Sequence, residues 1–226
     1  MSRKINPMSF RLGLSQVWNG LFQIYGKNLY FYSNFISSRF IIENYIKRSL
    51  MLQELILDSI HWSIRKKQIT LLVAYKNLSV FNSSKSVNLK KLVHQLLHLN
   101  IKLYLLRRTE WTNSATLLTN YATQSLQKSA NFKKTLNHVT YLLNNHLYTK
   151  KIVYNNKGII VLTLKGFKFK ISGRFDNARN QMSKTSNCIG GSLPLSQLNS
   201  HVEYHKANVY TKSGVNGLHI WLFYNS

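Results

Sequence analysis

The sequence predicts an α+β fold, because its apolar residues follow two different spacings in different parts of the chain. Over residues 34–58 and 117–143 they recur every three or four positions, which is typical of amphipathic helices. Over residues 167–171 they alternate with polar residues, which is typical of a strand with one buried face. Residues 219–224 form a short aliphatic and aromatic run, as expected of a buried strand.

Residues 40–108 are expected to form a first folded region. Residues 69–73 (Ile-Thr-Leu-Leu-Val) predict a strand, and residues 61–64 are its expected pairing partner. Residues 89–99 again have helical spacing, and residues 101–105 alternate in the manner of a strand. The predicted order of elements is therefore α-β-β-α-β.

A second folded region is expected after residue 110. A helix is predicted over residues 117–143, and strands are predicted from residue 152 onward. Residues 167–171 (Phe-Lys-Phe-Lys-Ile) predict a strand with one apolar and one basic face, a shape suited to lying on phosphates. The pair Gly190–Gly191 is interpreted as a loop.

These patterns divide the chain into three parts. Residues 1–39 are an N-terminal extension. Its aromatic side chains are expected to pack into a core, although those of the stretch 18–40 could instead stack bases. Residues 40–110 form the first domain. Residues 111–226 form a C-terminal α/β domain with a mixed or antiparallel sheet.

The charge balance indicates the kind of partner. The 226 residues contain 31 Lys and Arg against 6 Asp and Glu, a formal net charge of +25 at pH 7. Self-repulsion of this size calls for a polyanion, which is a nucleic acid, an anionic membrane surface or an acidic protein. The basic residues are spread along the chain, and this distribution favours a protein embedded in RNA.

Composition also bears on the compartment. The single cysteine, Cys188, has no partner in the chain for a disulfide, so a reducing compartment is expected. There is no apolar run of about eighteen residues and no secretory leader or presequence pattern. We therefore expect no membrane span and, for an organelle protein, synthesis inside the organelle. Frequent Asn, Lys, Ile, Tyr and Phe suit an AT-rich organelle genome.

Patterns for catalysis and metal binding are weak. The six carboxylates are far apart in sequence, which argues against paired-carboxylate or two-metal chemistry. His94 and His98 have helical spacing that can bind a metal, but they lack a nearby acid or cysteine and are interpreted as surface or RNA-facing. His201 and His205 are interpreted in the same way. We expect no enzyme activity, no cofactor and no metal site.

Several segments of the chain resemble one known family. Residues 4–13 (Lys-Ile-Asn-Pro-Met-Ser-Phe-Arg-Leu-Gly) are similar to the start of small-subunit ribosomal protein three. Residues 170–175 (Lys-Ile-Ser-Gly-Arg-Phe) resemble an internal strand and turn of that family. Residues 193–198, 202–204 and 211–223 resemble its end. Because their order and spacing are kept, the chain is identified as a member of the family, of a divergent mitochondrial type.

The resemblance implies a type II KH domain followed by the C-terminal α/β domain, so residues 40–110 are expected to be a divergent KH-like domain. The family's Gly-x-x-Gly loop would fall at residues 83–86, which here are Ser-Ser-Lys-Ser. A KH loop needs glycine for close approach of the backbone to nucleotides. This departure implies that ordinary KH binding of single strands is lost or altered.

The resemblance also implies contact with mRNA. In the family, basic residues on a helix of the C-terminal domain line the mRNA entry channel and help to unwind mRNA, in the pattern Phe-Arg-Arg-x-Met-Lys. Here residues 132–137 are Phe-Lys-Lys-Thr-Leu-Asn, which keeps two charges and loses the third. Lys lacks the bidentate fork of Arg, so a weakened unwinding role without nucleotide hydrolysis is implied.

We therefore expect a structural constituent of the mitochondrial small ribosomal subunit, in its head near the mRNA entry channel, within the mitochondrial matrix. The expected partners are small-subunit ribosomal RNA, mRNA, and small-subunit ribosomal proteins four, five, ten and fourteen. Phosphate contacts would position the protein without reading sequence. The predicted RNA-binding residues are Lys4, Arg11, Lys133, Lys134, Lys168, Lys170, Arg174 and Arg179.

Three other functions share part of this signature. A free organellar RNA-binding factor for splicing or transcript stability shares the charge, but the terminal motifs argue against it. A nuclease would depend on magnesium and on Asp176 or Glu203. A membrane-surface binder would require only the positive charge.

Overall fold

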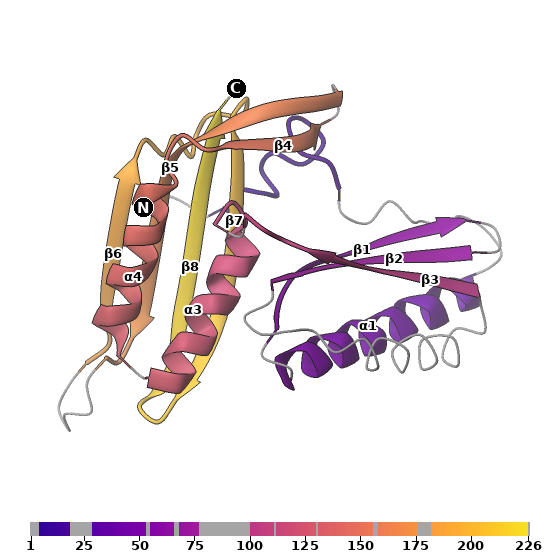
Figure 1. Cartoon of the computed structure of the whole chain (residues 1–226), viewed down its shortest axis with the longest axis horizontal. Helices are drawn as coiled ribbons and strands as arrows, with labels where there is room; N and C mark the ends of the chain where they lie inside the picture. The colour runs from indigo at the N-terminus through magenta and orange to yellow at the C-terminus, as the bar shows by residue number, and fades with distance from the viewer. Residues whose placement is uncertain are drawn as a thin grey trace. The chain divides into compact units, whose positions relative to one another are not determined.

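The computed structural model describes residues 5–18, 29–52, 55–65, 68–76, 100–110, 112–129, 131–155, 158–175 and 182–225. The chain divides into two units, which are seen in Figure 1. One unit combines Met1–Trp18 with Glu110–Ser226, and the other is Asn19–Thr109. The first 18 residues therefore belong with the C-terminal part of the chain rather than to a separate extension that ends at residue 39.

The unit Asn19–Thr109 holds a three-stranded sheet of mixed direction and a long helix. Strand β1 runs antiparallel to β2, and β2 runs parallel to β3. Figure 1 shows α1 along one face of this sheet, where Ile42, Ile46 and Leu50 pack with Leu71 and Val73 in one core. The described elements are α1 (Leu29–Leu52), β1 (Ile56–Arg65), β2 (Gln68–Lys76) and β3 (Asn100–Arg107).

The predicted strand pairing in this unit is confirmed, and the predicted helix end is wrong. His61 lies opposite Leu72 in the β1–β2 pair, and residues 101–105 lie within β3. The helix ends at Leu52, because the chain turns into β1 after it. Leu55 and Ile56 are both buried there, so they continue the apolar spacing past the helix. The helix predicted at 89–99 and the loop at 83–86 lie outside the described residues.

The other unit is built on a five-stranded antiparallel sheet of order β4-β5-β8-β7, with β6 also pairing with β5. Strand β5 is long enough for two partners in succession. Its first residues pair with β4, and its residues from Gly166 onward pair with β6. The strands are β4 (Lys150–Asn155), β5 (Gly158–Gly173), β6 (Lys184–Gly191), β7 (His201–Thr211) and β8 (Gly214–Asn225).

Two helices, α3 (Ala115–Ser129) and α4 (Phe132–Asn145), cover one face of this sheet in Figure 1. Their apolar side chains share one core with the inward side chains of β5 and β8. The prediction of one continuous helix over 117–143 is wrong in its middle. Asn131 caps a new helix there, since its side chain accepts a hydrogen bond from the Lys134 backbone N–H at 3.3 Å.

A glycine allows β5 and β6 to approach closely where β5 is irregular. The pairing of β5 with β8 shifts register between Leu164 and Gly166. Gly191 has a φ of +67°, and a Cβ atom there would lie 2.1 Å from the Lys165 carbonyl oxygen. The pair Gly190–Gly191, interpreted from sequence as a loop, therefore ends strand β6 instead.

Candidate nucleic-acid interface

Strand β5 has the alternation that the sequence predicted. Phe167, Phe169 and Ile171 are buried in the core beneath the helices. Lys168 and Lys170 alternate with them and are only partly buried, so they lie on the opposite side of the sheet. We call this side, which points away from α3 and α4, the outer face.

Aromatic side chains of β7 and β8 lie beside these lysines on the outer face. Lys168 is paired across the strands with Trp221, and Trp221 with Tyr204. Lys170 is paired with His219. The Lys168 Nζ atom lies 5.5 Å from the centre of the Trp221 ring, which is a cation–π contact. Positive charge and aromatic surface are therefore combined on one side of the sheet.

Helix α4 presents a second basic surface. Lys133 and Lys134 are exposed in its first turn, whereas Phe132, Leu136 and Val139 bury the other side of the helix. The first turn contains no acidic residue, so the two ammonium groups add to the positive end of the helix dipole. Because α4 covers the inner face of the sheet, this surface is separate from the outer face.

The remaining predicted contacts of the C-terminal region are less exposed or lie outside the described residues. Arg174 follows β5 directly, is half-buried, and accepts a hydrogen bond from Ser213 Oγ at its backbone carbonyl (3.1 Å). Lys4 and Arg179 lie outside the described residues.

The prediction that Arg11 contacts phosphate is wrong, because its side chain is 0% exposed. The guanidinium donates hydrogen bonds to backbone carbonyl oxygens of Pro7 (2.9 Å), Leu195 (2.9 Å), Gln197 (2.6 Å) and Ser200 (2.9 Å). Burial lowers the pKa of Arg11, but an arginine remains charged at neutral pH. Arg11 is therefore an internal clamp that ties the N-terminal segment to residues 194–200.

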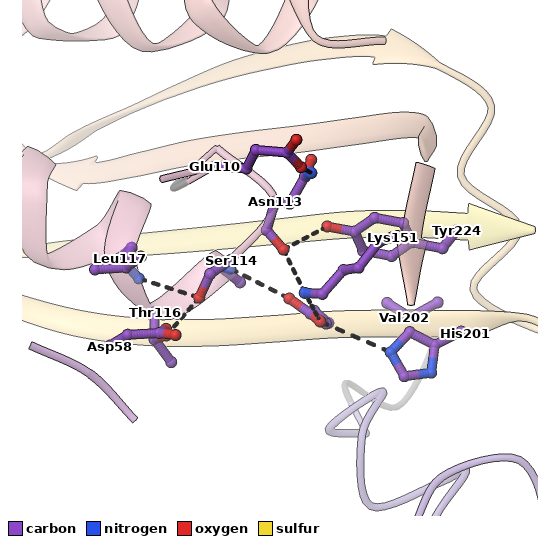
Figure 2. A network of polar contacts seen from close by, with 12 residues as sticks. Asp58, Glu110, Asn113, Ser114, Thr116, Leu117, Lys151, His201, Val202 and Tyr224 are labelled. Atoms are coloured by element: carbon purple, nitrogen blue, oxygen red, sulfur yellow. Dashed lines mark hydrogen bonds and ion pairs between the residues drawn. The ribbon is translucent and has the colours of Figure 1, made fainter. Parts of the chain in front are cut away.

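Sequence reasoning did not find a polar network that includes Lys151, Asn113 and Tyr224 (Figure 2). At its centre, by its hydrogen bonds and ion pair, is Glu203. Its carboxylate pairs with Lys151 Nζ at 2.5 Å and accepts a hydrogen bond from the Ala115 backbone N–H, at the start of α3, at 3.3 Å. Lys151 also donates to the Asn113 carbonyl oxygen, to which Tyr224 Oη donates at 2.8 Å. The network therefore joins β4, β7 and β8 to the beginning of α3.

The protonation of Glu203 follows from these partners. Burial alone would raise the pKa of its carboxyl, but the charge of Lys151 and the nearby His201 outweigh burial and lower the pKa to about 2. The carboxylate is thus ionised and held by protein groups. Its contacts are those of an internal ion pair and not those of a magnesium ligand, which removes the support for a nuclease from this residue.

His201 and His205 do not form the surface or RNA-facing pair expected from sequence. His205 Nδ1 lies 2.5 Å from Thr119 Oγ1 of α3, and His201 Nε2 lies 3.8 Å from Glu203. Among the described residues, no group of three His, Cys, Asp or Glu side chains is placed to hold a metal ion. No helix in the described part of the chain has the length and apolarity to cross a bilayer.

The fold and these surfaces define a class of protein. A strongly basic α+β chain, with lysines on two surfaces and Glu203 neutralised internally, has the features of a protein that binds a polyanion such as RNA.

The comparisons with known proteins give the family. The chain is 33% identical to small ribosomal subunit protein uS3m of Chondrus crispus over 229 residues, covering 99% of this chain and 94% of that protein. It is 25% identical to uS3c of Euglena longa, covering 98% and 99%, and 24% identical to uS3 of Pelagibacter ubique, covering 99% and 90%. No family model matches the chain. The chain belongs to the small ribosomal subunit protein uS3 family.

These alignments extend the resemblance seen in the terminal motifs to nearly the whole chain. The α+β architecture, with a KH-like unit and a C-terminal α/β unit, agrees with the fold that the resemblance implied.

Proposed function

We propose that this chain is a structural constituent of the small subunit of a mitochondrial ribosome and binds its ribosomal RNA without catalysis. The observation that carries this proposal is the match to a uS3m protein along 99% of the chain. The net charge of +25 supplies the attraction to phosphate, and most of the candidate lysines lie on exposed or partly exposed surfaces. Neighbouring small-subunit proteins would be its protein partners.

The α4 surface is the part that would face mRNA at the entry channel. Lys133 and Lys134 are adjacent in the first turn of α4, where cationic side chains and the positive end of the helix dipole both favour phosphate. Their role would be to hold one strand while the ribosome advances. Such a grip needs no nucleotide hydrolysis by this chain.

The location would be the mitochondrial matrix, and the gene would lie in the organelle genome. The support for this location is the identity to a mitochondrial relative and the frequent use of residues with AT-rich codons. The loop at residues 83–86 would bind RNA weakly, because it has no glycine. Replacing Ser83 and Ser86 with Ala should therefore leave assembly unchanged, and a large assembly defect would contradict this inference.

The test is gradient sedimentation of a mitochondrial lysate at moderate salt and magnesium, with this chain detected by mass spectrometry across the fractions. Migration with the small subunit, persisting after the subunits are separated, is the expected result. Recovery only in light fractions, or with a single transcript, would overturn the proposal and favour a free RNA-binding factor.

A further inference from the structure

Three aromatic rings form a cluster on the outer face of the C-terminal sheet. The ring centres of Tyr204 and Trp221 are 5.2 Å apart, those of His219 and Trp221 are 5.6 Å apart, and those of Tyr204 and His219 are 6.0 Å apart. The His219 and Trp221 planes differ by only 14°. We call this group of Tyr204, His219 and Trp221 the aromatic platform.

The platform is not part of the hydrophobic core. On β8, Leu218, Ile220 and Leu222 are fully buried beneath the helices, and the alternation therefore places His219 and Trp221 on the outer face. All three platform residues are partly exposed. Their neighbours on the same face, Val202 and Phe223, are buried (0% and 3% exposed), so it is the partly exposed rings of the platform that offer π surface to a ligand.

Hydrogen bonding holds the rings in place. The hydroxyl of Tyr204 and Nδ1 of His219 are 2.8 Å apart, so the two side chains are joined across strands β7 and β8. A platform that is ordered before binding loses less conformational entropy when a ligand arrives.

Lysines lie around the platform. Lys168 stands over the Trp221 ring, and Lys170 and the exposed Lys206 are the cross-strand neighbours of His219 on its two sides. On β5, β6, β7 and β8 the only carboxylate is Glu203, and it lies on the inner face against Lys151 and Ala115. The local charge of the outer face is therefore positive.

We propose that the aromatic platform binds an unpaired stretch of RNA, with at least one base stacked on its rings and the adjoining phosphates held by Lys168, Lys170 and Lys206. Unpaired bases expose their flat faces, whereas those of a duplex are already stacked, so the ligand is single-stranded. This inference rests on the proposed role in ribosomal RNA binding and adds a mode of contact, stacking, that phosphate binding alone does not provide.

The first test uses the full chain in which Trp18, Trp62 and Trp111 are replaced by Phe, so that Trp221 is the single remaining tryptophan of the four. A short single-stranded RNA should quench its fluorescence, and a duplex of the same sequence should quench it much less. Trp221→Leu in the natural chain should weaken single-strand binding about 5- to 150-fold, the range for one stacked base. Trp221→Phe should retain most of the affinity.

The matched control is Tyr210→Leu. Tyr210 is 71% exposed and lies on the same strand as Tyr204, about 20 Å further along it. Salt titration separates stacking from charge. Replacing Lys168 and Lys170 with Gln should lower the salt dependence of binding, whereas Trp221→Leu should leave that dependence unchanged.

The outcomes of the two proposals are distinguishable. If Trp221→Leu binds single strands like the natural chain while the lysine variant binds more weakly, stacking is overturned and ribosomal RNA binding stands. If the chain is absent from small-subunit fractions but Trp221 is quenched by single strands, the platform stands and the ribosomal role falls. If the Trp221→Leu variant does not fold, ultraviolet cross-linking of natural small subunits is the alternative test. A cross-link between RNA and the aromatic platform is expected. A protein bound at the platform instead of RNA would overturn the inference.

Discussion

Arg11 and Ser200 lie 189 positions apart in the chain and are joined by two hydrogen bonds. Arg11 Nε donates to the Ser200 carbonyl oxygen at 2.9 Å, and Nη2 donates to Ser200 Oγ at 3.2 Å. The fork of the guanidinium reaches several carbonyl oxygens at once, which an ammonium group cannot do. The N-terminal segment is thus fastened to the loop before β7 by one side chain.

Arg11→Lys should lower the free energy of unfolding of the C-terminal unit by about 2–3 kcal/mol, because carbonyl oxygens inside the protein lose their charged donor. Denaturant unfolding followed by circular dichroism measures the change. Arg108→Lys is the control, since Arg108 is 52% exposed and a lysine can keep its ion pair with Asp58. Equal stability of the two variants would contradict the clamp.

Glu203→Gln should destabilise the same unit by about 3 kcal/mol, because Lys151 would keep its charge and lose its partner at 2.5 Å. Glu110→Gln is the matched control, since Glu110 is exposed and accepts one hydrogen bond from Asn113 (3.1 Å). A double-mutant cycle with Lys151→Met measures the coupling directly. A coupling near zero would mean that the pair adds nothing to stability.

The stability of the unit should also depend on pH through Glu203. Its pKa falls from an ordinary 4.5 to about 2 on folding, so the unfolded chain takes up the proton first. The contribution, about 3 kcal/mol, is complete above about pH 4.5 and is lost as the pH falls toward about 2. Unfolding measured from pH 7 to pH 3 should show the natural chain converging on Glu203→Gln. If the stabilities of the natural chain and of Glu203→Gln changed in parallel with pH, the lowered pKa of Glu203 would be ruled out.

Gly191→Ala should destabilise the pairing of β5 with β6 by about 2–4 kcal/mol, because a Cβ atom 2.1 Å from the Lys165 carbonyl oxygen forces the backbones apart. Gly214→Ala is the control, because it introduces backbone strain without a steric clash. Gly214 has a φ of +120°, and no atom lies within 4 Å of its Cβ position. This substitution should cost about 1–2 kcal/mol. Thermal unfolding of both variants makes the comparison, and an equal loss would show that the contact at Gly191 does not matter.

Lys133→Glu combined with Lys134→Glu should slow translation through a structured mRNA entry region several-fold while subunits still assemble. The double variant places negative charge where mRNA phosphate would bind. The control is Lys184→Glu with Lys212→Glu, which makes the same charge change at two exposed positions outside α4. Ribosome profiles and reporters with and without a hairpin give the readout, and unchanged translation of the hairpin reporter would refute the role of α4.

Local patterns predicted much of the fold. The β1–β2 pair and the alternation of β5 follow from neighbouring residues, and both agree with the structure. The break between α3 and α4 was missed because the apolar spacing runs on through it, and the cap at Asn131 is a single hydrogen bond. Lys133 and Lys134 were expected at a surface because few acidic residues are available to pair with them, and both are exposed; their contact with RNA stays a prediction.

Contacts between distant segments account for what was missed. Glu203 and Lys151 are 52 positions apart, and nothing near either one in sequence marks the other as a partner. Arg11 has the same side chain as a phosphate-binding arginine, and only its burial reveals a different role. The outer position of Trp221 had a usable signal, since Leu218, Ile220 and Leu222 alternate with it, but the run of large side chains suggested a strand buried on both faces.

The position of Arg11 in the chain also imposes an order on synthesis. The acceptors of its guanidinium are made up to 189 residues later, which at roughly 5–20 residues per second is about 10–40 s. During that interval Arg11 is a hydrated cation, and the C-terminal unit is open. A product that stops before residue 194 lacks every carbonyl oxygen that this loop offers to the Arg11 guanidinium. The clamp therefore closes only after residues 194–200 have been made, so the N-terminal segment is fixed in place late in synthesis.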